Sequence, residues 1–279
     1  MRSVLISGCS SGIGRASCVR LARDGWRVFA GVRSDADLRS VEAEAGEIAA
    51  IRLDVTDTSS INATRTRIER ELNGALDALV NNAGIAVGGP LETVPPWDLR
   101  HILDVNVVGQ VAVTQAFLPL LRAARGRILF IGSVGGRVAF PYAGPYHASK
   151  FALEAVADSM RAELRPQGVS VSLLEPGPIA TPIWAKARKQ VASLRAGLSG
   201  ETGPLYAEKL QGFEKRLSSA EESGGAAEEV AEKVLKVLRA NSPASRYQVG
   251  RGAKTLVSMR PLAPDALFES LARRFTAGR

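Results

Sequence analysis

Three glycines near the start of the chain constrain its fold more than any other feature. A short apolar run at 4–6 precedes them, residues 15–23 follow with apolar side chains at helical spacing, and the glycines lie in Gly8-Cys9-Ser10-Ser11-Gly12-Ile13-Gly14. Glycine lets a backbone turn tightly and approach a ligand, and the start of the following helix offers free N–H groups to an anion. With a second apolar run at 26–31, the unit predicts a site for the pyrophosphate of a dinucleotide.

The alternation of apolar runs and helical stretches continues along the chain. Further strand-like runs lie at 48–53, 77–80, 127–131, 169–174 and 247–250. Helical stretches lie at 35–45, 58–73, 97–122, 146–165 and 226–240. Parallel strands need right-handed crossovers, so the helices must cover both faces of the sheet. The sequence therefore predicts an α/β chain of the Rossmann type, with one doubly wound parallel sheet of about seven strands.

We interpret residues 1–279 as a single domain with three parts. Residues 1–177 form the cofactor-binding and catalytic core. Residues 178–225 turn polar, rich in Lys, Arg, Glu, Gly and Ser, and follow the sixth strand where open sheets bind ligands, which predicts a mobile substrate lid. Residues 226–279 hold the last helix, the last strand and an amphipathic tail helix at 264–275. This tail could cap the lid, pack in a dimer or touch a membrane surface.

Composition narrows the class of protein. Of 279 residues 46% are hydrophobic, yet no window offers 18 uninterrupted apolar residues and no signal core precedes the first strand. The two cysteines and two histidines lack ligand or disulfide spacing, so we expect no metal site and a cytoplasmic protein. The net charge of +8 is dispersed without an aromatic-interleaved stripe. We therefore expect an anionic small ligand and no nucleic-acid partner.

The end of the second strand predicts which dinucleotide binds. An NAD enzyme usually has Asp or Glu there, but this chain has Gly31 and then Arg33. A guanidinium can clasp a 2′-phosphate, which favours NADP(H) over NAD(H), although Asp35 and Asp37 lie close by. The adenine and ribose are expected to lie against residues that follow the third and fourth strands, namely Asp54, Val55, Asn82, Ala83 and Gly84.

Tyr146 and Lys150 predict proton-transfer chemistry. Residues four apart share one face of a helix, so the phenol and the ammonium can point into the same space. A phenol has a reference pKa of about 10, and a neighbouring ammonium favours the phenolate and lowers that pKa. Such a tyrosine could exchange protons with an alcohol or a carbonyl, while the Ser133 hydroxyl holds the same oxygen.

Together these motifs resemble the short-chain dehydrogenase/reductase family. The matching residues, in family order, are Ser7-Gly8-Cys9-Ser10-Ser11-Gly12-Ile13-Gly14, Asn81-Asn82-Ala83-Gly84, Asn106, Ser133, Tyr146-x-x-x-Lys150 and Pro176-Gly177. The resemblance covers residues 3 to about 183 densely and the remainder loosely. Ser7 stands where threonine is usual, Ser11 where many NADP-dependent members have a basic residue, and His147 where asparagine is commoner.

The resemblance implies a role for each matched residue. Tyr146 would be the general acid/base, Lys150 would lower its pKa and hold the nicotinamide ribose, and Ser133 would clamp the substrate oxygen. Asn106 would be a helix-kink residue that anchors a water of the proton relay. The nicotinamide carboxamide would meet the segment after the sixth strand, at Pro176, Gly177, Ile179 and Thr181. Relatives usually pair their long helices across a two-fold axis, so we expect a homodimer or homotetramer.

The residues around Ser133 and Tyr146 resemble the 17β-hydroxysteroid and retinol dehydrogenase branch. That resemblance implies reversible hydride transfer between NADP(H) and a lipophilic alcohol, ketone or aldehyde. Beside Ser133, the expected apolar substrate wall is Val134, Val138, Phe140, Tyr142, Ile183 and Trp184. Two alternatives stay open. One is a 3-oxoacyl-thioester reductase whose Arg122, Arg125 and Arg127 dock an acidic carrier protein, and the other is a non-catalytic NADP-binding sensor or scaffold.

Overall fold

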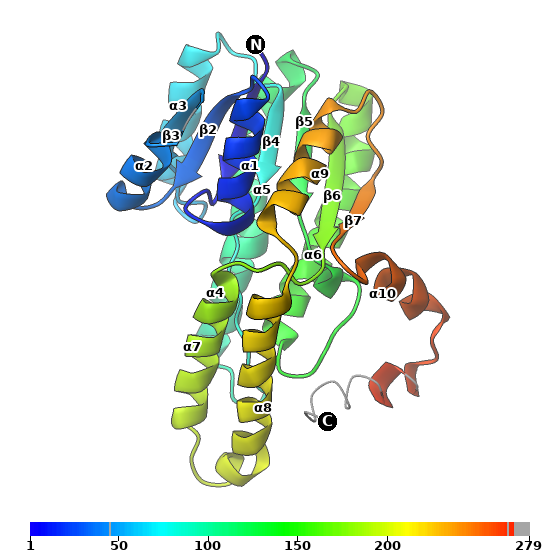
Figure 1. Ribbon diagram of the computed structural model, residues 1–279. Coiled ribbons are helices and arrows are strands. Elements are labelled where there is room, and N and C mark those ends of the chain that lie inside the picture. Colours follow the sequence, from blue (N-terminus) through cyan, green and yellow to red (C-terminus); the bar gives the residue numbers. More distant parts are fainter. Residues whose placement is uncertain (45, 267, 271–279) are drawn as a thin grey trace.

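A seven-stranded parallel sheet forms the centre of the protein, with strand order β3-β2-β1-β4-β5-β6-β7 (Figure 1). The computed structural model describes residues 1–44, 46–266 and 268–270. The strands are β1 (Ser3–Ser7), β2 (Arg27–Val32), β3 (Ile48–Arg52), β4 (Ala78–Asn81), β5 (Arg127–Ile131), β6 (Ser170–Pro176) and β7 (Arg246–Val249). The predicted fold class is confirmed. Strand order reverses between β1 and β4, which opens a crevice at their carboxyl ends.

Helices cover both faces because alternate residues of each strand point to opposite sides. Val4 and Ile6 of β1 pack with α1 (Gly12–Arg23), α2 (Asp35–Glu42) and α9 (Ala227–Arg239). Leu5 packs on the other side, where the sheet is covered by α3 (Thr58–Glu71), α5 (Gly109–Ala123) and α6 (Gly144–Leu164). The strands are buried on both sides, as expected when crossovers place helices on each face.

The helical stretch expected at 97–122 is one long helix with a widened turn inside it. It consists of α4 (Pro96–Leu103), the π-helical turn η1 (Asp104–Val108) and α5. By length and composition, Pro96–Ala123 could cross a membrane. Val113, Phe117 and Leu121, however, are fully buried in the core that this helix shares with the sheet. A core helix of this kind has the same composition as a spanning helix.

Residues 178–225 form a hairpin of two helices, α7 (Ile183–Ala196) and α8 (Thr202–Ser223), which projects from the carboxyl end of the sheet (Figure 1). The hairpin has its own apolar core, in which Val191, Leu210 and Phe213 are buried. Its two ends meet, because Ala180 N–H donates to Gly225 O at 2.9 Å and Gly225 N–H donates to Pro178 O at 3.0 Å. The hairpin therefore leaves and rejoins the core at one point.

The last part of the chain holds α9, β7 and two short elements that the sequence did not indicate, α10 (Ala253–Met259) and the 3-10 turn η4 (Arg260–Leu262). Helix α10 has only seven residues, too few for a periodic apolar pattern to identify it. The helix expected at 264–275 lies partly outside the described residues. Within its described part, Phe268 packs beside Phe140, with ring centroids 5.9 Å apart.

Candidate active site

A cleft of about 570 Å³ opens at the carboxyl ends of the strands and gathers most residues singled out in the sequence. Of the predicted cofactor residues, those that line it are Gly8, Ser10, Ser11, Gly12, Ile13, Arg33, Asp54, Val55, Asn82, Ala83, Gly84, Tyr146, Lys150, Pro176, Gly177, Ile179 and Thr181. Ser133, Ile183 and Trp184 also line it. Gly14 and Asn106 lie behind this wall. The two ends of the cleft thus carry the nucleotide motifs and the Ser133–Tyr146–Lys150 group.

The glycine turn is shaped by close packing and leaves the start of α1 open to the cleft. A Cβ on Gly14 would lie 2.3 Å from Gly8 O and 2.5 Å from Asn82 Nδ2, so only glycine fits there. At the N-cap of α1 the Ser11 side chain makes no capping hydrogen bond, and the first turn of the helix contains no acidic residue. The N–H groups and positive end of α1 therefore remain available to an anion.

Ser7 and Asn82 fix the end of β4 against this turn. Ser7 Oγ accepts hydrogen bonds from the N–H groups of Asn82 and Ala83, each at 3.0 Å. Asn82 Nδ2 donates to the carbonyl oxygens of Ser7 at 2.9 Å and Gly8 at 3.0 Å. Asn82 thus links the segment after β4 to the glycine turn after β1. The hydroxyl retained at Ser7 was the one sign of this role in the sequence, and the role itself was not predicted.

Arg33 lines the nucleotide end of the cleft, as do Asp37 and Asp54. Its backbone is held by Arg52, whose guanidinium donates to Arg33 O at 3.0 Å. Burial pushes the pKa of Asp54 up, but hydrogen bonds from Thr56 and the charge of Arg33 outweigh it and hold that pKa below its ordinary value. The next residue, Ser34, caps α2 by accepting from Asp37 N–H at 3.1 Å.

At the other end of the cleft, Tyr146 and Ser133 face each other across a side-chain hydrogen bond. Burial is the main influence on Tyr146 and raises its pKa, while the bond to Ser133 lowers it. The net direction is thus opposite to the lowering expected from Lys150, whose effect on the phenol stays a prediction. Lys150 Nζ donates to Ile131 O at 2.9 Å, and burial lowers the pKa of this ammonium to about 8. Its nitrogen lies 5.8 Å from the centre of the Tyr146 ring.

Asn106 occupies the π-helical turn η1 and is fully buried. Its Oδ1 accepts from Ile85 N–H at 2.8 Å, and its Nδ2 donates to Ile85 O at 2.9 Å and Ser149 Oγ at 3.0 Å. Ser149 Oγ in turn donates to Tyr146 O at 2.7 Å. The widened turn thus lets Asn106 join the cleft wall at Ile85 to the helix of Tyr146. Its water-anchoring role stays a prediction.

His147, to which the sequence assigned no role, ties the turn of Ser133 to helix α6. Its Nδ1 lies 2.9 Å from Gly135 O, and because a carbonyl only accepts, this nitrogen carries the proton. Gly135 N–H donates to Ser133 Oγ at 3.0 Å. Burial lowers the pKa of His147, which keeps the ring neutral near pH 7. The ring therefore helps to fix the Ser133 oxygen relative to Tyr146.

Four residues expected in the substrate wall do not line this cleft. Val138 is buried beside a second, smaller cavity, and Tyr142 packs into the core of the α7–α8 hairpin. Phe140 lies against His147 and Phe268, and Val134 lies within the 3-10 turn η2 (Val134–Gly136). Ile85, Ala86 and Val105, which the sequence did not single out, do line the cleft, and they belong to segments whose position depends on tertiary packing.

Comparisons with known proteins agree with this geometry. The model of the short chain dehydrogenase family matches residues 2–192. The chain is 34% identical over 278 residues to an NADPH-dependent 3-dehydrocapnine reductase from Ornithobacterium rhinotracheale, covering 97% of this chain and 96% of that protein. It is 38% identical over 271 residues to human 17-beta-hydroxysteroid dehydrogenase type 1, covering 92% and 80%.

A solved structure agrees as well. A short chain dehydrogenase from Burkholderia cenocepacia in complex with NADP is 25% identical, with a TM-score of 0.72 and coverage of 99% of both chains. The family match spans well over half of the sequence, and the two relatives are covered over most of their length. This protein belongs to the short-chain dehydrogenase/reductase family of oxidoreductases, which act on CH–OH and carbonyl groups.

Proposed function

We propose that the protein transfers a hydride between NADP(H) and a lipophilic ketone, aldehyde or secondary alcohol. One observation carries this proposal. The open start of α1, the Arg33 guanidinium and the Ser133–Tyr146 pair all line the same cleft. The nucleotide end fits a dinucleotide, because the open N-terminus of α1 has no acid in its first turn. The names of similar proteins include an NADPH-dependent reductase and an NADP complex, which supports the phosphorylated cofactor.

Each residue at the catalytic end has a task in this proposal. A bound nicotinamide would supply or accept the hydride. In reduction, the Tyr146 hydroxyl donates its proton to the carbonyl oxygen, while Ser133 O–H holds the same oxygen. Lys150 would hold the nicotinamide ribose and bring positive charge to the phenol. The raised pKa of Tyr146 keeps the phenol protonated near neutral pH, as a proton donor requires.

The substrate end of the cleft is mostly apolar. Trp184 donates its indole N–H to Ile179 O at 2.6 Å, so its ring offers the cleft only apolar surface. Ile85, Ala86 and Ile183 extend this surface. Pockets of this kind bind by burying apolar area and use a few polar groups for orientation. A lipophilic carbonyl compound whose single oxygen meets Ser133 and Tyr146 suits this wall.

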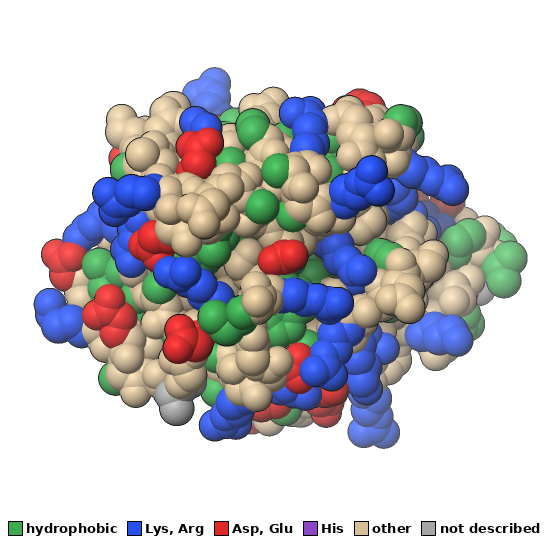
Figure 2. Space-filling view, turned by 90° about the horizontal axis from the view of Figure 1, so that it is seen from above, with side chains coloured by type: hydrophobic (Ala, Val, Ile, Leu, Met, Phe, Trp, Pro, Cys, Tyr) green, Lys and Arg blue, Asp and Glu red, His purple; other side chains and the backbone are tan. Residues whose placement is uncertain are grey.

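The thioester-reductase alternative is weakened by the position of its docking residues. Arg127 begins β5, at the end of the sheet opposite the cleft, and donates to Leu238 O at 2.7 Å. Arg122 donates to Gln167 Oε1 on the same side of the molecule. Figure 2 views that end and shows basic side chains spread among acidic and apolar ones (Figure 2). A carrier docked there would have to reach past the whole sheet to deliver a thioester to Tyr146.

The NADP assignment predicts a specific effect of Arg33→Ala. A charge-assisted hydrogen bond is worth about 1.5–3 kcal/mol, so NADPH affinity should fall about tenfold or more while NADH affinity stays within about twofold. Parallel fluorescence titrations of the two nucleotides measure this. Arg39→Ala removes the same charge from an exposed position that does not line the cleft and serves as the control. Equal losses for NADPH and NADH, or tighter binding of NADH by the unmodified protein, would overturn the assignment.

A further inference from the structure

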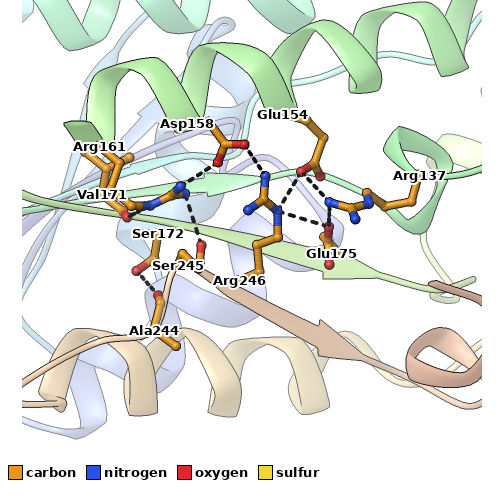
Figure 3. Close-up of polar contacts among 10 residues, drawn as sticks. All are labelled: Arg137, Glu154, Asp158, Arg161, Val171, Ser172, Glu175, Ala244, Ser245 and Arg246. Carbon is orange, nitrogen blue, oxygen red and sulfur yellow. Dashed lines mark hydrogen bonds and ion pairs between the residues drawn. The ribbon is translucent and has the colours of Figure 1, made fainter. Parts of the chain in front are cut away.

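Beside the cleft, a partly buried cluster of charged side chains joins three of its wall segments (Figure 3). Glu154 lies on α6, two turns after Tyr146 and one turn after Lys150, and is 7% exposed. Glu175 lies at the end of β6, directly before Pro176, and is fully buried. Arg137 ends the turn that begins at Ser133. Arg246 reaches in from β7.

Within the part of the chain that the structure describes, Glu154 and Glu175 each have one carboxyl oxygen that receives no hydrogen bond. Oε1 of Glu154 and Oε1 of Glu175 are both buried without a hydrogen-bond partner among the described residues. Burial, and after it the neighbouring Glu154 carboxyl, raise the pKa of Glu175 to about 7. One proton held between the carboxyls would satisfy both orphaned oxygens at once.

The surrounding charges favour one negative charge on this pair more than two. Arg246 Nε donates to Glu154 Oε2 at 2.9 Å but lies 3.8 Å from Glu175 Oε1. Arg137 lies 3.5 Å from Glu154 Oε2 and 3.9 Å from Glu175 Oε1. Direct contact of both arginines thus falls mainly on Glu154. The other polar contact of Glu175 is the Gln248 side chain from β7.

The remaining charged groups around the pair are already engaged. Asp158, one turn further along α6, pairs with the second nitrogen of Arg246 and with Arg161. Lys150, one turn before Glu154, donates to Ile131 O. From α10, Ala253 packs beside Gly177, and Arg260 pairs with Asp265. Because these groups are held in ion pairs or hydrogen bonds, we expect the cluster to gain or lose its proton at the Glu154–Glu175 pair.

We propose that Glu154 and Glu175 share one proton, and that the shared proton positions Ser133, Tyr146 and the segment after Pro176 relative to one another. This rests on the proposed function only where it concerns catalysis. The turn at Gly136 packs so closely on α6 that a movement of Glu154 would move the turn as well. A Cβ on Gly136 would lie 2.8 Å from Lys150 O and 3.1 Å from Glu154 Cγ. The turn that begins at Ser133 thus lies directly on the Lys150–Glu154 face of α6. Loss of the proton would place two like charges in contact across the α6–β6 boundary.

The expected pH dependence follows from the raised pKa. The folded protein keeps the proton up to about pH 7, whereas a glutamate in the unfolded chain loses it near 4.5. The folded state therefore binds more protons between these values, so the pair's contribution to stability is full below about 4.5 and is lost as pH rises to about 7. Above that pH the two charged carboxylates repel each other, and the geometry at Ser133 and Tyr146 should relax.

Carbon-13 NMR of the full-length protein tests the shared proton without reference to any activity. With carboxyl-labelled glutamate, one carboxyl resonance should titrate between about pH 6 and 8 in the wild type and vanish from that range in Glu175→Gln. A glutamine donates an N–H toward Glu154 and so mimics the protonated state. Asp158→Asn, a change in the same cluster, should leave the titration in place. Absence of a carboxyl titrating in this range, or its persistence in Glu175→Gln, overturns the proposal.

The positioning role has its own readout. The chain has four tyrosines, so ring-labelled Tyr146 can be assigned by mutation. Its resonance should shift in step with the carboxyl titration in the wild type and not in Glu175→Gln. Turnover with NADPH should likewise decline above about pH 7 in the wild type and stay level in the variant up to the titration of Lys150, near pH 8. If the Tyr146 resonance does not shift when the carboxyl titrates, the positioning role is overturned. If the two titrate together but the protein has no activity, only the proposed function is contradicted.

Discussion

Replacing Tyr146 with phenylalanine is expected to lower kcat for carbonyl reduction by about 10²–10⁴ while NADPH affinity stays within about twofold, because a positioned general acid contributes that much. The ring keeps its packing, so the change removes only the hydroxyl that bonds Ser133 and that we propose as the proton donor. Stopped-flow or steady-state loss of NADPH absorbance gives kcat, and nucleotide titration gives affinity. Both can be measured on the same preparation.

Tyr142→Phe is the matched control for this prediction. Tyr142 lies nearby and its pKa is also raised by burial, but its ring packs into the α7–α8 hairpin and does not line the cleft. Turnover by Tyr142→Phe should stay within about twofold of the wild type, because a substitution away from the reacting groups usually has a small effect. Full activity in Tyr146→Phe, or an equal loss in both variants, would contradict the assignment of Tyr146 as the proton donor.

Gly14→Ala is expected to damage both stability and nucleotide binding. The new methyl group would lie 2.3 Å from Gly8 O and 2.5 Å from Asn82 Nδ2. It would therefore also separate Asn82 from the Gly8 carbonyl that it now holds at 3.0 Å. Overpacking of this kind costs about 1–3 kcal/mol. Urea unfolding should show that loss, and NADPH binding should weaken at least tenfold because the turn can no longer approach a pyrophosphate.

Gly203→Ala provides the control for the glycine turn. Gly203 lies in α8, and a Cβ there would meet nothing within 4 Å. Alanine in a helix is about 0.5–1 kcal/mol more favourable than glycine, so this variant should be at least as stable as the wild type. If Gly14→Ala unfolded like Gly203→Ala and still bound NADPH, the close packing of the turn would not matter for the site.

The nucleotide end of the cleft could be predicted from sequence because its motifs act locally. A glycine turn between a strand and a helix has one geometry, and the carboxyl ends of parallel strands meet at one edge. Gly8, the residues from Ser10 to Ile13, Asp54 and Asn82 therefore line the cleft as expected. The helix that carries Tyr146 and Lys150 was also identifiable, since the two residues are one turn apart on a periodic stretch.

The other features of the site could not be predicted because they depend on contacts between segments that are distant in sequence. Tyr142, expected in the substrate wall, does not line the cleft because its ring packs into the α7–α8 hairpin, and Val138 lies beside the smaller cavity. The direction of the Tyr146 pKa follows from how deeply the ring is enclosed, and spacing along a helix carries no such information. The Glu154–Glu175 pair brings together residues from a helix and a strand, and no local pattern marks such a pair.

Isotope transfer tests the central claim most directly. NADPH deuterated at the nicotinamide C4 position would be incubated with the protein and, separately, a steroid ketone, a retinoid aldehyde and a 3-oxoacyl thioester. Mass spectrometry should find deuterium on the carbinol carbon of the steroid or retinoid product, and about 10²–10⁴ times more slowly with Tyr146→Phe. Deuterium mainly in the thioester product would favour the thioester alternative. Tight NADPH binding with no deuterium in any product would contradict the account and favour a non-catalytic sensor.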